Sequence, residues 1–373
     1  MLRLIVIVIS IACLKCSIAS GQQILRGKII EFGNSEYIPY ANISLTQNEG
    51  TASDISGNFL LPIRLELAKG KLVISSIGYE TKSLSLDSLL AKGEVVHQIF
   101  LKPVSFLLQE VAVQEKKLTP VDIVKEALIA ITKNYLQDPF NMEFYSRVTT
   151  GPLDKPEYLS ETIVKTYRSG YRENAQNFSR ISHKRITGIN PLPLYDKKRK
   201  LEYFAYENLP GFDVFLVDLI GGTKLQGSIF NPDYFKRLEF RHLENTRFEN
   251  DTVTVIEYDV NGFKPDNERS FRGKLYISTR TLAILRHERR IGRSLFDVIY
   301  KPIDGYYFPY FIKSIYKASQ DATSIEITHE AYITKIITQN PEAFSTHFDQ
   351  KNWHLNDVPF NKAFWDTNYP LKD

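Results

Sequence analysis

The sequence predicts a mainly β protein: an N-terminal β-sandwich, one linking helix, and then a larger antiparallel β-sheet domain. Three observations lead to this fold class. Short apolar runs separated by Asn, Asp and Gly fill the first hundred residues, which is typical of a sandwich. A single stretch with helical spacing of apolar residues follows residue 119. From residue 140 to about residue 339 the apolar period returns to two, and the 21 Tyr and 23 Phe suit strands.

Residues 1–20 have the composition of a secretion signal. Arg3 precedes an apolar run from Leu4 to Leu14, and small residues close the segment at Ala19-Ser20. The apolar run is too short to span a bilayer, which takes about 20 residues. We therefore expect cleavage near Ser20, a mature chain without a transmembrane segment, and export to the periplasm or the outer membrane.

Charge and cysteine content narrow the class of protein. Loss of Arg3 and Lys15 with the leader lowers the formal net charge from +4 to +2, which argues against a nucleic-acid-binding protein. Cys13 and Cys16 both lie in the leader, so the mature chain has no disulfide. A secreted eukaryotic protein would usually carry disulfides, so a bacterial envelope protein is favoured. Ser10 to Cys13 faintly resembles a lipoprotein cleavage box, and a lipid on Cys13 stays an alternative.

Five strands are predicted between residues 22 and 104, which we expect to fold as an independent domain. They are Leu25–Glu31, Ile38–Leu45, Phe59–Ile63, Leu72–Ile77 and Val95–Leu101. The segment from Asp54 to Phe59 is a predicted turn, because Gly57 can adopt a positive φ and Asp54 can accept from the backbone ahead of it. Gly78-Tyr79 predicts a second turn.

Four of these segments carry a family resemblance. In order they read Leu25-Arg26-Gly27-Lys28-Ile29, Ile38-Pro39-Tyr40-Ala41-Asn42-Ile43, Ser53-Asp54-Ile55-Ser56-Gly57-Asn58-Phe59 and Val73-Ile74-Ser75-Ser76-Ile77-Gly78-Tyr79-Glu80. The series resembles the carboxypeptidase-like regulatory domain of Gram-negative envelope proteins, and Leu108 to Val113 is similar to that family's exit segment. The resemblance implies a transthyretin-like sandwich of seven strands that has no catalytic residues of its own.

A linker, residues 105–118, leads to the predicted helix. Thr119 suits the N-cap, Pro120 the first helical position, and Asp122 the positive end of the helix. The helix ends before Asp138-Pro139. One apolar stripe is formed by Val121, Val124, Leu128, Ile131 and Tyr135. We expect this stripe to pack on the sheet that follows; a partner-binding face is the alternative.

The helix and the antiparallel sheet together occupy residues 119–340. Predicted strands are Phe140–Thr149, Tyr158–Tyr167, Thr252–Val260, Gly273–Ser278, Leu282–Arg289, Tyr306–Tyr316 and Ser324–Ile337. A change of apolar phase within Thr252–Val260 predicts a β-bulge there. A short helical excursion is expected within Gly211–Tyr234. The tail, residues 341–373, carries aromatics that we expect to pack back onto the domain.

The Gly273–Arg289 hairpin and the strand entry from Asp304 to Pro309 weakly resemble periplasmic lipoprotein-carrier sheets. That resemblance implies a curved half-barrel around a lipid chain. Ser278 departs from it, because an acidic turn residue is expected at that position.

The residues give no catalytic, cofactor-binding or metal-binding site. The seven histidines lack metal-ligand spacing: His97, His183, His242, His287, His329, His347 and His354. His329 shares a predicted strand face with apolar residues and is interpreted as a core histidine, with catalysis as the alternative to test. No Gly-x-Ser-x-Gly elbow occurs, and the Gly221–Ser228 run lacks the end of a phosphate loop. The basic runs Lys197–Lys200 and Arg286–Arg290 are interpreted as solvated, with lipid phosphate as the alternative partner.

We therefore expect a non-enzymatic envelope binding or scaffold protein that needs no cofactor. We expect its partners to be other envelope proteins, glycans or lipids and not nucleic acid, and we keep peripheral association with the outer membrane as an alternative. The first alternative is a periplasmic lipid or lipoprotein carrier with a cupped sheet. The second alternative is a hydrolase that carries a regulatory sandwich.

Overall fold

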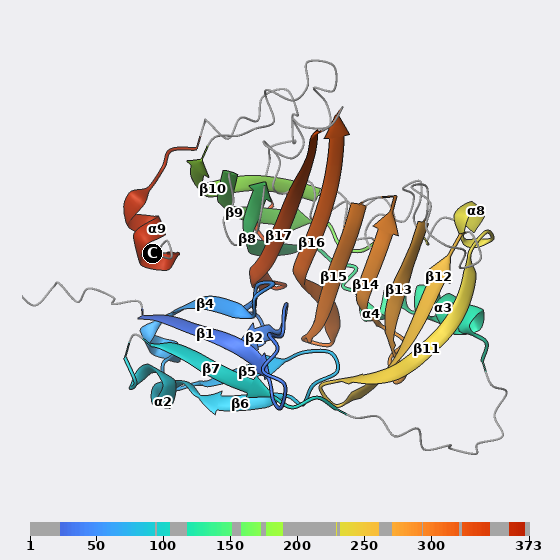
Figure 1. Cartoon of the computed structure of the whole chain (residues 1–373), viewed down its shortest axis with the longest axis horizontal. Helices are drawn as coiled ribbons and strands as arrows, with labels where there is room; N and C mark the ends of the chain where they lie inside the picture. Colours follow the sequence, from blue (N-terminus) through green and yellow to red (C-terminus); the bar gives the residue numbers. More distant parts are fainter. Residues whose placement is uncertain are drawn as a thin grey trace, which may run out of the picture.

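The fold was determined as a computed structural model, in which two β-rich parts lie side by side (Figure 1). The residues that the structure describes are 23–93, 95–104, 118–150, 158–172, 177–188, 229, 232–260, 271–292, 294–320, 323–343 and 358–369. The mainly β fold class is confirmed. The leader, the exit segment, nearly all of the linker and the basic run 197–200 lie outside the described residues, as do His347 and His354.

The N-terminal part is a sandwich of seven strands in two sheets. One sheet has the order β4-β1-β7, and the other has the order β3-β2-β5-β6. The strands are β1 (Gln23–Glu31), β2 (Asn42–Ser44), β3 (Gly50–Ala52), β4 (Asn58–Ile63), β5 (Lys71–Ser75), β6 (Lys82–Ser85) and β7 (Val96–Leu101). A 3₁₀ turn η1 (Leu65–Leu67) and the helix α2 (Leu86–Leu90) complete it. Buried side chains from both sheets, among them Ile29, Ile43 and Ile74, form one apolar core.

The strand predicted over Ile38–Leu45 is shorter than expected. Only Asn42–Ser44 pairs as β2, because Pro39 has no amide hydrogen to donate and Tyr40 has a φ of +59°. A left-handed backbone at a tyrosine is uncommon and costs free energy. Here it turns the ring of Tyr40 onto Phe311 of the large sheet, with ring centroids 4.3 Å apart.

The linking helix forms where predicted but in two pieces, α3 (Pro120–Ile129) and α4 (Ile131–Asn134). Thr119 is the N-cap, and Asp122 completes a reciprocal capping box with it. The apolar stripe packs on the large sheet, as expected: Val124 and Tyr135 are fully buried in its core. The Tyr135 hydroxyl also donates to the carbonyl of Ile284, 2.8 Å away.

The C-terminal part is one antiparallel sheet of ten strands in the order β10-β9-β8-β17-β16-β15-β14-β13-β12-β11. Its strands are β8 (Phe140–Thr150), β9 (Tyr158–Arg168), β10 (Asn177–Gly188), β11 (Glu239–Phe248), β12 (Asp251–Asp259), β13 (Phe271–Ser278), β14 (Ile284–Ile291), β15 (Ser294–Ile303), β16 (Tyr306–Gln320) and β17 (Thr323–Ile337). The hairpin predicted over Gly273–Arg289 is present as β13 and β14, while β10, β11 and β15 were not predicted.

The predicted bulge in Thr252–Val260 is wrong. β12 pairs with β13 without a register shift, and the shift against β11 lies between His242 and Glu244. His242 pairs with Ile256 and Glu244 pairs with Val255, so Leu243 is the extra, unpaired residue of the bulge and belongs to β11. β12 is apolar in both phases because Val255 and Ile256, on opposite faces, are both buried.

Two shorter helices lie beyond the sheet's strands. The predicted excursion over Gly211–Tyr234 is described only at its end, where α8 spans Pro232–Phe235. The helix α9 (Lys362–Asn368) belongs to the aromatic tail and packs back on the domain, since its Trp365 is fully buried. Among the described residues, no helix combines the length and apolarity needed to cross a membrane.

The two faces of the large sheet have different covers. The helices α3 and α4 cover one face, which contributes Phe144, Ile312 and Ala331 to the main core. The sandwich docks on the middle of the other face, where Ala52 packs with Phe311 and Tyr332 in a separate small cluster. The rest of that second face, beside the docked sandwich, is where a site could form.

Candidate functional site

A row of charged residues crosses all ten strands on the face that the sandwich touches. In strand order from β10 to β11, each residue is the direct cross-strand partner of the next: Arg185, Glu161, Arg147, Glu330, Lys313, Asp297, Glu288, Lys274, Glu257 and Arg241. The sign alternates except between Asp297 and Glu288, and Arg286 on the same face bridges that step. We call these eleven residues the charge ladder. Opposite charges directly across strands stabilise a sheet and fix its register.

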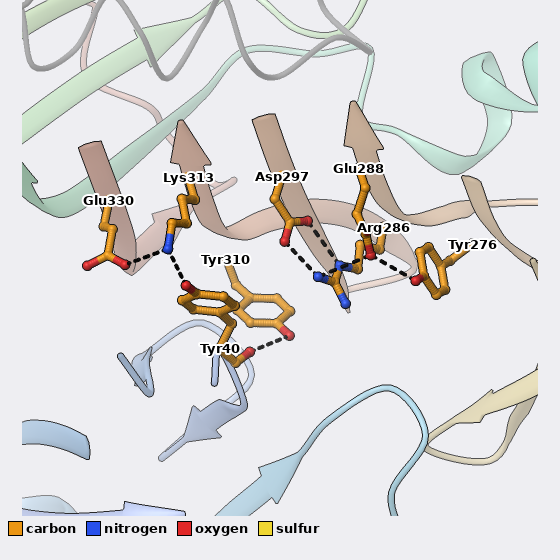
Figure 2. Close-up of polar contacts among 8 residues, drawn as sticks. All are labelled: Tyr40, Tyr276, Arg286, Glu288, Asp297, Tyr310, Lys313 and Glu330. Atoms are coloured by element: carbon orange, nitrogen blue, oxygen red, sulfur yellow. Dashed lines mark hydrogen bonds and ion pairs between the residues drawn. The ribbon is translucent and has the colours of Figure 1, made fainter. Parts of the chain in front are cut away.

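The middle of the charge ladder is neutralised within the protein (Figure 2). Arg286 binds Asp297 with two parallel bonds, Nε–Oδ1 at 3.0 Å and Nη2–Oδ2 at 2.7 Å. The same Nη2 lies 3.2 Å from Oε1 of Glu288, to which Tyr276 also donates. Arg286, Glu288 and Asp297 line a small cleft of about 470 Å³. Two of its cations, Arg286 and Lys313, are bound to carboxylates of the protein itself.

Tyr40 of the sandwich seals the centre of the ladder. Its hydroxyl contacts Nζ of Lys313, and Lys313 lies 3.5 Å from Oε1 of Glu330. The Tyr310 hydroxyl donates to the Tyr40 carbonyl from beside this pair, as Figure 2 shows. Burial first, and Glu330 second, raise the pKa of Tyr40. Tyr40 therefore stays a neutral hydroxyl at the contact between the two parts of the protein.

Two carboxylates beyond this contact are each held by a tyrosine and a cation. Glu161 accepts from the Tyr145 hydroxyl and from Nε of Arg185, the latter at 2.6 Å. Glu330 accepts from the Tyr332 hydroxyl at 3.0 Å and faces Lys313. Burial, and then the adjacent carboxylate, raise the pKa of both tyrosines well above its usual value, which keeps both hydroxyls as donors.

Arg147 lies between these two carboxylates, of which Glu330 keeps one buried oxygen, Oε1, without a hydrogen bond. Its cross-strand neighbours are Glu161 and Glu330, yet within the described part of the chain no ion pair within 4 Å or hydrogen bond joins it to either. Its Nε is buried and has no hydrogen-bond partner. A buried N–H of a cation without an acceptor is costly. Arg147 is therefore a charged donor group that the folded protein leaves unsatisfied.

Arg147 faces a large cleft of about 850 Å³. The walls of this cleft come from three parts of the protein. These are β3 and β4 of the sandwich, β8–β10 and β17 of the large sheet, and α9 of the tail. Most other charges on its walls are paired, as Arg64 is with Glu49 at 2.6 Å and Lys165 is with Glu143 at 3.6 Å. Lys335 adds an exposed cation at the rim.

The wall formed by α9 is held by aromatic contacts. Trp365 donates from Nε1 to the Lys184 carbonyl at 2.7 Å, and its ring lies under the Arg185 guanidinium at 4.6 Å. Phe364 stacks on His183 with centroids 3.6 Å apart, and Tyr369 stacks on Tyr145. Arg185 also donates to the Tyr369 carbonyl. Arg185 is thus fully used in holding the cleft together, in contrast with Arg147.

His329, which the sequence singled out, and His287 lie on the helix-covered face of the large sheet. His329 is 1% exposed, and its Nε2 lies 2.8 Å from the Ser146 hydroxyl. His287 is buried with its Nε2 2.7 Å from the Tyr258 hydroxyl, and burial holds its pKa well below the usual value. No group of three or more His, Cys, Asp or Glu that could hold a metal is found among the described residues.

The interpretation of Arg286–Arg290 as a solvated run is wrong for His287 and Arg289, and the alternative of a lipid-phosphate partner stays a prediction. Alternation along β14 turns His287 and Arg289 into the helix-covered face, where both are buried. Arg286 faces the other side and is bound to Asp297. Arg147 was not predicted as a site residue. Its signal is weak but present: it shares the polar phase of Phe140–Thr150 with Glu143 and Tyr145, opposite Met142, Phe144 and Val148.

Comparison with known proteins supports the N-terminal resemblance. Residues 25–113 match the family described as the CarboxypepD_reg-like domain, so the chain carries this domain. No curated protein is significantly similar to the chain.

Several solved structures are distantly similar to the chain. One is a DUF1329 family protein from Desulfovibrio piger, 10% identical, covering 65% of this chain and 100% of that one with a TM-score of 0.26. A LolA superfamily protein from Nitrosomonas europaea is 12% identical with the same coverage and TM-score. The MucA/MucB complex of Pseudomonas aeruginosa matches at 10% identity over 60% of this chain and 99% of that chain, with a TM-score of 0.20. At this distance the likeness does not extend to a ligand or a partner.

Proposed function

We propose that this chain is a non-catalytic binding protein of the bacterial cell envelope that holds an acidic ligand in the large cleft. The observation that carries the proposal is Arg147, whose Nε is buried without an acceptor at the wall of that cleft. Guanidinium binds carboxylate or phosphate through two parallel hydrogen bonds in a fixed plane. An acidic group entering the cleft would complete the one ladder cation whose buried donor has no partner.

The charge balance on this side of the sandwich favours an anion. Glu161 is shared by Tyr145 and Arg185, and Glu330 is shared by Tyr332 and Lys313. Both carboxylates are therefore already stabilised by other groups. Because the cleft is partly shielded from water, the attraction between Arg147 and a bound anion is stronger than between the same groups in bulk water. A neutral acceptor would satisfy Nε–H without the charge–charge attraction, and a cationic ligand would be repelled by Arg147.

The apolar face of the large sheet is already covered, which argues against a carrier of lipid chains. In the described residues, that face of the sheet is packed against α3 and α4 with residues such as Tyr135 and Phe308 fully buried. The large cleft lies on the opposite, charged face. A lipid could contribute a phosphate headgroup to Arg147, but the large cleft offers charged and aromatic walls instead of an apolar tunnel.

The absence of catalysis stays part of the proposal. Support comes from His329 and His287, which are buried and contact hydroxyls on the face opposite the large cleft. His183 lines the large cleft but is stacked on Phe364. The envelope location rests on the leader-like residues 1–20 and on the CarboxypepD_reg-like domain. Envelope proteins, acidic glycans and lipid headgroups are the partner classes that carry the required group.

Calorimetric titration with three acidic probes tests the proposal: glutarate, inorganic phosphate and trigalacturonate. We expect at least one probe to bind the wild-type chain, Arg147→Lys to weaken binding, and Arg147→Gln to abolish it. Arg241→Gln is the matched control, since Arg241 is an exposed ladder residue paired with Glu257 outside the large cleft. A probe at ten times its Kd should stabilise the fold by about 1.4 kcal/mol. Binding that Arg147→Gln leaves unchanged would refute the proposal.

A further inference from the structure

The edge of one sandwich strand faces the large cleft. β4 is the outer strand of its sheet, whose order is β4-β1-β7, and among the described residues it pairs only with β1. Five consecutive residues, Asn58–Pro62, line the cleft. Consecutive residues of a strand point to opposite faces, so a cleft lined by all of them meets the backbone edge of the strand. In Figure 1, β4 is the sandwich strand on the side of α9 and β8.

Pro62 shows which backbone groups of β4 point into the cleft. It lies opposite Ile24 in the antiparallel pair and cannot donate to β1. In such a pair, alternate residues bond to the partner strand and the others point away from it. Phe59 and Leu61 therefore bond to β1, which agrees with the bond from the Ile29 amide to the Gly57 carbonyl. The N–H and C=O of Leu60 point outward.

The neighbouring outward groups are accounted for. Asn58 uses its N–H and C=O within the turn, bonding Asp54 at 2.8 and 2.7 Å. Pro62 adds an outward carbonyl but no donor. Leu60 thus presents one donor and one acceptor, the pair through which an added antiparallel strand exchanges two hydrogen bonds.

We infer that the ligand of the large cleft is an extended polypeptide segment of a partner protein, which adds to β4 as a further strand and places a carboxylate at Arg147. This inference rests on the proposed function. A strand added at β4 would lie roughly 4.8 Å from it, inside the cleft whose sheet-side wall carries Arg147. The carboxylate could come from an Asp or Glu side chain or from the free end of the segment.

The combination of groups favours a polypeptide over an acidic glycan. A sugar chain has no regular series of N–H and C=O groups to match a strand edge, whereas a peptide satisfies the edge and the cation together. Pro62 has a second reading, since proline on an edge strand prevents unwanted strand pairing. That reading leaves the outward groups of Leu60 without a ligand, and the experiment separates the two.

The test screens the full-length chain against a synthetic library of eight-residue peptides, made with free and with amidated C-termini. The best binder is then remade with N-methyl groups at one or the other set of alternate residues. Leu60→Pro removes the outward donor without touching the β1 pairing, and Leu60→Thr is its control with the donor retained. Affinity is measured by fluorescence anisotropy, and circular dichroism checks that each variant is folded.

We expect binders to share one acidic position or to require the free carboxyl terminus. N-methylation of one alternate set, the Leu60→Pro change and Arg147→Gln should each weaken binding by about tenfold or more, while Leu60→Thr should not. If Leu60→Pro fails to fold, the N-methylation pattern decides. Peptide affinity indifferent to N-methylation overturns the inference. So does a chain that binds glutarate through Arg147 but binds no peptide, and that result leaves the proposed function intact.

Discussion

Arg147 and Arg185 are the same residue type in the same charge ladder, two strands apart, yet their surroundings differ in a way that separates structure from function. Arg185 is buried, bonds Glu161 at 2.6 Å, donates to the Tyr369 carbonyl and covers Trp365. Arg147 has none of these contacts. The buried Nε–H of Arg147 lacks an acceptor and so adds nothing to folding stability.

The stability of the two arginine variants is expected to differ. Arg185→Gln leaves Glu161 buried without its cation and should lower the free energy of unfolding by about 3 kcal/mol or more. Arg147→Gln should cost less than about 1 kcal/mol, because both neighbouring carboxylates keep a tyrosine and another cation. Urea unfolding of both variants measures this. Equal losses would show that Arg147 is a structural member of the ladder.

Protonation of His287 should make the fold less stable in mild acid. Burial holds the pKa of His287 well below its usual value of 6.5, so the folded state resists the proton that the unfolded state accepts. The free energy of unfolding is unaffected by His287 above pH 6.5. Below that pH it falls by up to about 1.4 kcal/mol per pH unit, because only the unfolded state takes up the proton. Thermal unfolding between pH 7 and 5.5 should show this slope, and His287→Gln should flatten it. An unchanged slope would exclude His287 as its source.

Individual residues show where sequence reasoning stops. The alternation of β14 could have placed His287 and Arg289 opposite Arg286, but the sequence does not say that both faces of that strand are covered. The Nε–H of Arg147 lacks an acceptor because the neighbouring carboxylates bind other groups. This arrangement depends on Tyr145, Tyr332 and the strand register together, which no local pattern encodes.

At the scale of elements, residues close in sequence predicted the structure correctly where the backbone itself imposes it. The N-cap at Thr119, the turn at Gly57 and the hairpin around residues 279–281 all depend on residues close in sequence. β10 and β11 were missed because charged and polar residues break the apolar alternation in both strands. β15 was missed although its sequence is largely apolar. β2 was overextended because nothing local predicts a positive φ at Tyr40.

The turn before β4 gives a test at this scale. Gly57 has a φ of +75°, and a Cβ there would lie 2.5 Å from the Ile29 carbonyl oxygen. Gly93 has a φ of +76° with nothing within 4 Å of such a Cβ. Gly93→Val introduces the same backbone strain without a clash. Gly57→Val should therefore destabilise the fold by about 1–3 kcal/mol more than Gly93→Val, and this difference measures the clash with Ile29. Chemical denaturation of both variants decides; equal effects would mean that the contact with Ile29 is unimportant.

At the scale of the whole molecule, the sandwich has its own core and meets the sheet through a second, small cluster around Phe311. That residues 22–104 fold alone stays a prediction. The sequence indicated both parts but gave no sign that the sandwich docks on the charged face, since docking joins residues as distant as Tyr40 and Lys313. This docking creates the large cleft, because neither part alone supplies both the β4 edge and Arg147.

The central claim is that the large cleft receives an acidic group at Arg147, and the Nε–Hε signal of Arg147 in a side-chain nitrogen NMR spectrum tests it most directly. Nε is buried, so its proton should exchange slowly enough to be seen, and the signal is assigned by its loss in Arg147→Gln. Titration with glutarate should move this signal to a saturating end point while the Nε signal of Arg185, already bonded to Glu161, stays in place. An Arg147 signal that does not move, or that moves without saturation alongside the exposed Arg241, would contradict the account.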